Sequence, residues 1–328
     1  MLKTFKTGGV GQLAAIVLTL AALWWPAFAR PVTPENSAFF SPLYELLYRW
    51  LVSVPRFASA AALLLVVCEG LFLNMLLVNH KITNSHSLLP MFLYIVLMSW
   101  NPEQLTLTPA LLVNLIVLCS ISQLLSNGGT SLPSGKNFNT SMLIAIASLT
   151  YLPAITLIIP YLIVYTYYKL YKWRDIAVGI LGMAAPFIVF ATYAYLDDKL
   201  IYYWFLSKHD IGIINLKLER VTTLRTATSV ILAILTLVSL IHVVSHNIDN
   251  VAHQRINTGV LSLPIISAIL ISCYCGFGPF VMQLFAPSFA FILTVFLFVS
   301  RRREWIGDVL LWIIPVAAVV NSLFTVHQ

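Results

Sequence analysis

The polar segment from Asp197 to Arg225 carries residue types that bind phosphate and sugar. Its candidate binding residues are Trp204, Lys208, His209 and Asp210. A lysine can hold a phosphate, an indole ring can cover the apolar face of a sugar, and a carboxylate can accept a proton. The alternative is a solvated loop that closes a helix hairpin, because any long loop is polar. Both interpretations of this segment stay open.

A second polar segment, Arg30 to Arg56, contains a stretch whose spacing predicts an amphipathic helix over residues 41–54 that lies in the membrane surface. Pro42 suits its first turn. Glu45 and Arg49 stand on the polar face. The helix either packs over the bundle, with these two residues as an ordinary i,i+4 pair, or it roofs a site that faces lipid. The apolar stripe consists of Leu43, Leu46, Leu47, Trp50, Leu51 and Val54.

Glu69 is the strongest intramembrane candidate. It lies near the middle of the apolar run 57–79, where an ionised carboxylate costs about 2.5–3.5 kcal/mol on insertion scales. We therefore expect it to face the bundle interior or water. It either handles a proton or cation, or is a protonated carboxyl bonded to a neighbouring helix through a group such as Asn74 or Asn114.

The elements that position these residues are apolar. The chain is 59% hydrophobic and 9% charged, against roughly 25% charged in a soluble domain, and its mean hydropathy is +0.89. The fold class predicted is all-α, a polytopic transmembrane bundle of about eleven spans that forms one integral membrane domain over residues 1–328, with 30–56 and 197–225 as long external segments. The expected spans are 9–29, 57–79, 87–100, 108–125, 139–151, 153–171, 176–196, 226–245, 258–276, 280–300 and 305–325.

Basic residues predict the orientation. With Lys3 and Lys6 in the cytoplasm, the inner side holds 11 of the 19 lysines and arginines, and the other 8 fall in the two long external segments. A break at Pro153, which cannot continue a helix ladder, is needed to keep the cluster 301–303 inside. We expect a bacterial inner-membrane protein with a cytoplasmic N-terminus and a periplasmic C-terminus.

Several chemistries lack their signatures. The glycine-rich stretch 129–137 imitates a phosphate-binding loop but has the wrong spacing, and Asn137 replaces the Ser or Thr that would hold magnesium. Cys273 and Cys275 stand two apart, a spacing that completes no zinc site. We expect no metal and no cofactor.

Short motifs along most of the chain resemble an uncharacterised family of polytopic Bacteroidota inner-membrane proteins. That family has no established activity, so the resemblance implies only the inner-membrane placement. The motifs are Leu88-Leu89-Pro90, Ser99-Trp100-Asn101-Pro102-Glu103, Phe138-Asn139, Ser148-Leu149, Tyr151-Leu152-Pro153, Trp173-Arg174-Asp175, and Gly182 with Pro186.

The order of elements is also similar to that of the GT-C type glycosyltransferases, which use polyprenyl-phosphate sugars. They have a first span, an external loop with an interfacial helix, and then many spans. Ser41-Pro42-Leu43-Tyr44 looks like the start of their loop helix. Those enzymes usually place an Asp in that loop as base or metal ligand, whereas here Glu35 is the loop's acid before the helix. The chain is thus expected to be a transferase of this type or a degenerate relative.

The leading functional hypothesis is the handling of a lipid-linked sugar for the cell envelope, with membrane lipid and a polyprenyl-phosphate sugar as partners and no nucleic acid. Glu35 is the candidate base. Arg30, Arg49 and Lys208 are candidate phosphate ligands, and Tyr44 and Trp204 are candidate stacking surfaces. One alternative is a transporter of a small solute or ion that is centred on Glu69. Another is a structural subunit of an envelope complex, which would have protein partners.

Overall fold

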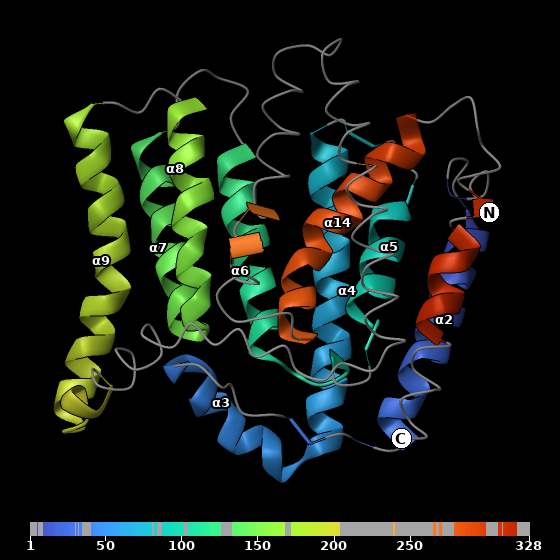
Figure 1. Ribbon diagram of the computed structural model, residues 1–328, viewed down its shortest axis with the longest axis horizontal. Helices are drawn as coiled ribbons and strands as arrows, with labels where there is room; N and C mark the ends of the chain where they lie inside the picture. Colours follow the sequence, from blue (N-terminus) through green and yellow to red (C-terminus); the bar gives the residue numbers. More distant parts are fainter. Residues whose placement is uncertain are drawn as a thin grey trace.

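The chain folds into helices that run side by side, as the computed structural model shows (Figure 1). Among the residues that the structure describes, the regular elements are helical and none is a strand. The described residues are 5, 9–29, 31, 33–34, 41–80, 82–83, 87–101, 104–125, 133–167, 172–203, 239, 265–266, 269–270, 279–299, 308–309 and 311–319. The helices are α2 (Val10–Ala29), α3 (Pro42–Ser53), α4 (Pro55–Asn79), α5 (Leu89–Met98), α6 (Pro109–Leu125), α7 (Ser134–Thr150), η2 (Leu152–Leu157), α8 (Ile158–Tyr167), α9 (Trp173–Leu196) and α14 (Pro279–Val299).

Three described helices, α2, α4 and α9, are long and apolar enough to cross a membrane. Shorter apolar helices accompany them at Leu89–Met98, Pro109–Leu125, Leu152–Tyr165 and Gln283–Leu297. The all-helical class is confirmed, and these helices are compatible with a membrane protein. The count of about eleven spans stays a prediction, and the predicted spans 226–245 and 258–276 lie almost entirely outside the described residues.

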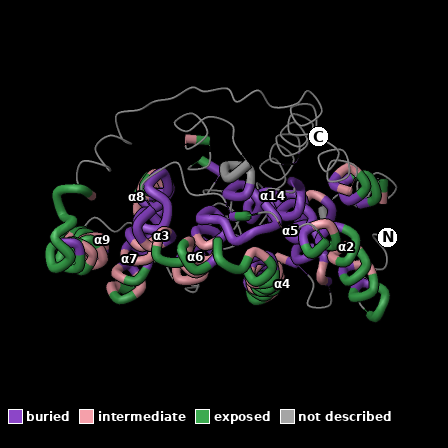
Figure 2. Tube along the Cα trace, turned by 90° about the horizontal axis from the view of Figure 1, so that it is seen from below, coloured by how far each residue is buried: buried purple, intermediate pink, exposed green. Residues whose placement is uncertain are grey.

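The helices form a row from α9 through α7, α6 and α4 to α2, with α8, α14 and α5 behind it (Figure 2). In this view the buried residues gather in α5 and α14, while α9, α4 and α2 expose one face. The exposed faces are apolar, as the side chains of Leu181, Ile188 and Leu64 illustrate at 62%, 64% and 62% exposure. Apolar side chains on the outside and polar ones inside are the arrangement expected of helices in lipid.

The break predicted at Pro153 is present. Helix α7 ends at Thr150, Tyr151 is extended, and the chain reverses through η2 into α8. Asn137 near the start of α7 hydrogen-bonds Tyr165 near the end of α8, although 28 residues of continuous helix would separate them by about 42 Å. Residues 139–171 are therefore not one straight helix.

Helix α5 is short and fully enclosed. Its ten residues are all buried and span about 15 Å, half of a hydrocarbon core of about 30 Å. Side chains of α2 hold both ends, because Gln12 Oε1 accepts from the Leu88 amide at 2.8 Å and Trp24 Nε1 donates to Ser99 Oγ at 2.9 Å. Non-helical backbone at such depth is tolerated only where protein buries it, and α2 supplies that cover.

Candidate functional site

A space bordered by candidate site elements lies beneath helix α3. It is an apolar cavity of about 560 Å³ between α3, α7 and α9. That volume falls within the roughly 300–1,000 Å³ of ligand pockets. Its walls are almost entirely carbon, so the occupant they suit is an apolar chain. The lining residues are Pro42, Leu43 and Leu46 of α3, Met142, Ile146 and Leu149 of α7, Ala185, Pro186, Val189, Phe190 and Tyr193 of α9, and Tyr203.

Helix α3 crosses the end of the bundle, as its amphipathic pattern predicts (Figure 1). Tyr44 fixes its position, since the side chain is fully buried and its hydroxyl donates to the Leu107 carbonyl at 2.9 Å. Leu51 is also buried, whereas Trp50 on the same predicted stripe is 81% exposed. The helix therefore covers the cavity with one side and leaves the indole of Trp50 exposed.

Two glycines on α9 allow close approach of its neighbours, Gly182 that of α7 and Gly179 that of α8. A Cβ at Gly182 would lie 2.6 Å from the Phe138 carbonyl oxygen and 2.2 Å from Ser141 Oγ, so only glycine fits there. One turn earlier, a Cβ at Gly179 would lie 3.2 Å from the Tyr165 hydroxyl. The cavity begins in the next turn, at Ala185.

Asn137 ties α7, α8 and α9 together. Its amide nitrogen donates to the Tyr165 hydroxyl and to the Asp175 carbonyl, both at 2.8 Å, and its oxygen accepts from the Tyr161 hydroxyl. The side chain is fully buried. Because every polar atom of the amide is used, this cluster holds the cavity walls in register.

The rim of the cavity is polar and charged. Lys199 Nζ pairs with Asp197 at 2.6 Å, and Arg49 pairs with Glu45 at 3.4 Å. The hydrogen bond to Asp197 raises the pKa of Lys199, while Arg49 acts against that rise. Burial, and then Glu45, raises the pKa of Tyr203. Because Arg49 influences Lys199 and Glu45 influences Tyr203, the polar face of α3 lies near residues 197–203.

The turn that brings Lys199 to the rim depends on Asp198. Its φ of 54° is left-handed. The Lys199 amide donates to the Ala194 carbonyl and the Asp198 amide to the Tyr195 carbonyl, which is the Schellman arrangement that ends a helix. Asp is one of the few residues besides glycine that accept this conformation.

We expect Asp198→Val to lower the free energy of unfolding by about 1–2 kcal/mol, because a β-branched side chain is strained at positive φ. Asp198→Gly is expected to match or exceed the wild type, since glycine adopts this conformation freely. Thermal unfolding of the purified protein in detergent measures both. Equal midpoints for the two variants would show that the left-handed turn does not form.

The sequence-predicted site residues divide into two groups. Arg49 lies on the rim, with 70% of its side chain exposed. Tyr44 lies under α3 with its hydroxyl occupied, so stacking on a sugar, which stays a prediction, would require that hydrogen bond to open. The remaining candidates lie outside the described residues, namely Arg30, Glu35, Trp204, Lys208, His209 and Asp210.

Glu69 lies in the protein interior, as expected. Its side chain is fully buried, and the Tyr94 hydroxyl of α5 donates to Oε2. The sequence predicted a bond through a group such as Asn74 or Asn114, whereas the side chain that hydrogen-bonds Glu69 is Tyr94. The sequence signal for the true partner was the phenol in the otherwise apolar run Leu89–Met98.

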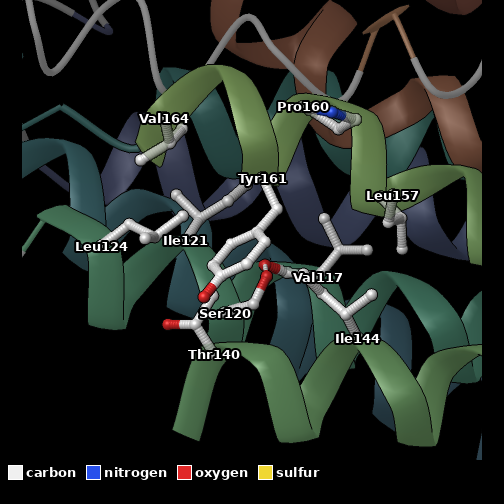
Figure 3. Close-up of a pocket in the computed structure, with 10 residues that line it drawn as sticks. All are labelled: Val117, Ser120, Ile121, Leu124, Thr140, Ile144, Leu157, Pro160, Tyr161 and Val164. Atoms are coloured by element: carbon white, nitrogen blue, oxygen red, sulfur yellow. Dashed lines mark hydrogen bonds between the residues drawn. The ribbon is translucent and has the colours of Figure 1, made fainter. Parts of the chain in front are cut away.

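A second pocket, between α6, α7 and α8, is too small for a substrate. Its volume is about 30 Å³, the share of one water molecule. Tyr161 extends into it between Ser120 and Thr140 (Figure 3). All three hydroxyls already have acceptors: Ser120 donates to the Val117 carbonyl, Thr140 to the Lys136 carbonyl and Tyr161 to the Asn137 side chain. The pocket is a packing gap.

Within the described residues, no cluster of three or more His, Cys, Asp or Glu side chains is arranged to hold a metal ion. Comparison with known proteins found no matching family model, no curated relative and no similar solved structure. Fold and site therefore define the class: an all-helical protein with membrane-compatible helices and an apolar cavity beneath a surface helix.

Proposed function

We propose that this protein binds a lipid-linked anionic substrate, a polyprenyl-phosphate sugar, for use in the cell envelope. The observation that carries the proposal is the apolar cavity of about 560 Å³ beneath α3 with charged groups at its rim. A hydrocarbon chain gains about 25 cal/mol for each Å² of apolar surface it buries. A phosphate gains charge-assisted hydrogen bonds from basic side chains. The cavity and its rim supply both kinds of contact to one amphipathic molecule.

The chain of the lipid lies between Leu43 and Leu46 above and the walls of α7 and α9 on either side. Its phosphate meets Arg49 and Lys199. Both cations already have carboxylate partners in this structure, and exposed pairs of this kind are worth only about 0–1 kcal/mol. The cations therefore exchange those partners for a phosphate at little cost.

The catalytic part of the proposal rests on the external segments. Glu35 acts as base, and Arg30 and Lys208 bind the phosphate. Trp204 stacks on the sugar, and His209 and Asp210 also bind the substrate. These roles follow from residue type and the GT-C resemblance. If the acid is not used, the protein is a degenerate relative that binds and presents the same lipid. The finer topology of about eleven spans in the inner membrane, with the N-terminus inside, belongs to the same proposal.

The test fills the cavity. Ile146→Trp on α7 and Ala185→Trp on α9 place an indole in opposite walls, and we expect each to weaken binding of a polyprenyl phosphate at least tenfold. Ile188→Trp is the matched control, because Ile188 is on α9 but is 64% exposed and lines no part of the cavity. Native mass spectrometry of the purified protein with added lipid gives the bound fraction. Wild-type binding by both wall variants would remove the cavity from the proposal.

A second arm separates chain from head group. Arg49→Ala combined with Lys199→Ala is expected to weaken binding of polyprenyl phosphate while leaving uncharged polyprenol unchanged, because only the former has charge for the rim to recognise. Equal loss for both lipids would show that the substitutions disturb α3 itself.

A further inference from the structure

The carboxyl group of Glu69 is incompletely satisfied. Oε2 accepts from Tyr94, and Oε1 has no hydrogen-bond partner within bonding geometry, although the backbone amide of Leu115 on α6 lies close to the carboxyl group. Asn114 of α6 lies close to the Tyr94 hydroxyl, and its own Oδ1 is also without a partner. Two buried acceptor oxygens around one phenol lack hydrogens. A proton on the carboxyl is the smallest addition that supplies one.

The described helices packed around Glu69 provide no positive charge to balance a carboxylate. Helices α2, α5, α6 and α14 contain no Lys, Arg or His. The titratable groups that they present toward Glu69 are Tyr94 and Cys119. On α4 itself the other titratable groups are Cys68 and Arg56. Helix α3 joins α4 at its first turn and carries Tyr44, Glu45, Tyr48 and Arg49. That turn is 14 residues, or about 21 Å, from Glu69.

A chain of buried polar groups leads from this site to the end of the bundle that α3 covers. Asn114 Nδ2 donates to the Gln283 carbonyl at 2.8 Å, and Thr108 Oγ1 donates to Gln283 Oε1 at 2.6 Å. Next to Thr108, the Leu107 carbonyl accepts from Tyr44 of α3. Each of the four polar side chains is at most 3% exposed. Polar side chains in an apolar bundle are costly, and these follow one another from Glu69 toward the α3 end of the bundle.

We propose that Glu69 reversibly binds a proton that enters from the α3 end along the polar chain formed by Thr108, Gln283, Asn114 and Tyr94. The step is the addition of H⁺ from water to the carboxylate and its return to water, with no other bond changed. The site is separate from the lipid cavity and does not depend on it. It makes proton coupling available to the protein and gives the transport alternative a physical basis.

Infrared spectroscopy of the protein in lipid vesicles tests the site. We expect a protonated-carboxyl carbonyl band at neutral pH that is absent in Glu69→Gln and present in Glu45→Gln, a surface carboxyl control. On transfer to D₂O the band is expected to shift as the proton exchanges. Absence of a band that depends on Glu69 would overturn the proposal, as would its disappearance on adding Na⁺, which would identify a sodium site instead.

The route has its own test. Asn114→Leu removes one member of the polar chain, and we expect it to slow the D₂O shift of the Glu69 band at least tenfold while leaving the band in place. Asn74→Leu is the matched control, because Asn74 is an asparagine of α4 whose Oδ1 likewise lacks a partner but which is not in the chain. An unchanged rate in Asn114→Leu, or equal slowing in both variants, would eliminate this route.

Discussion

Gly182→Ala is expected to lower the free energy of unfolding by about 1–3 kcal/mol, the usual penalty for overpacking a well-packed contact. Alanine should stabilise an isolated helix by about 0.5–1 kcal/mol relative to glycine. The expected change in stability therefore has the opposite sign to the one that helix propensity alone predicts. The reason is geometric, because the new Cβ would lie 2.6 Å from a backbone oxygen of Phe138. Backbone cannot rotate away as a side chain can, and α9 must therefore shift away from α7.

Gly135→Ala is the matched control for that substitution. Gly135 is also helical, but it is exposed and nothing lies within 4 Å of a Cβ built on it. We expect it to be neutral or slightly stabilising. Thermal unfolding measures stability in both variants. Lipid binding is measured alongside it, because α9 forms one wall of the cavity and its displacement in Gly182→Ala should change the cavity. Wild-type stability in Gly182→Ala would mean that α7 and α9 do not pack as closely as described.

The sequence predicted most element bounds because each depends on local signals. The apolar run 57–79 became α4, the run 176–196 became α9, and the break at Pro153 separates α7 from η2. Proline lacks an amide hydrogen and an apolar run must satisfy its own backbone, so both features are visible without knowledge of the neighbours. The amphipathic helix at 42–53 was predictable for the same reason.

The cavity was not predictable from the sequence. Val189 lines it and Ile188 beside it does not, yet in a membrane protein both are apolar residues that an insertion scale treats alike. Which of them faces lipid and which faces a cavity depends on how α3 lies across α7 and α9. The same limit applied to Glu69, whose partner Tyr94 comes from a helix that reads as uniformly apolar.

The external segments illustrate a different limit. Lys208, His209 and Asp210 have suitable chemistry, but residue type alone does not bring them to the rim. The described part of that segment, ending at Tyr203, does reach the polar face of α3. This supports the part of the proposal that places the head group of the lipid at the rim. The roles of Glu35 and of residues 208–210 are to be tested separately.

Asn137→Leu is expected to lower both the stability of the protein and its binding of lipid. Leucine has nearly the shape of asparagine but accepts and donates nothing, so the hydroxyls of Tyr161 and Tyr165 and the Asp175 carbonyl lose contacts with the amide. A buried polar group left unsatisfied costs about 1–3 kcal/mol. The Tyr165 hydroxyl still donates to the Asp175 carbonyl, so the Tyr161 hydroxyl is the one group that loses its partner, and we expect a decrease of about 1–3 kcal/mol in the free energy of unfolding.

Asn74→Leu is the control for this substitution too, because the Oδ1 of Asn74 already lacks a partner, and its loss should change stability by less than about 1 kcal/mol. Denaturation in detergent gives the free energies, and lipid binding reports the cavity. If Asn137 holds α7, α8 and α9 in register, then both stability and binding fall together in Asn137→Leu, because the three helices it joins include two walls of the cavity. A variant that lost stability but bound polyprenyl phosphate as the wild type does would separate the cluster from the cavity and place the lipid elsewhere on the molecule.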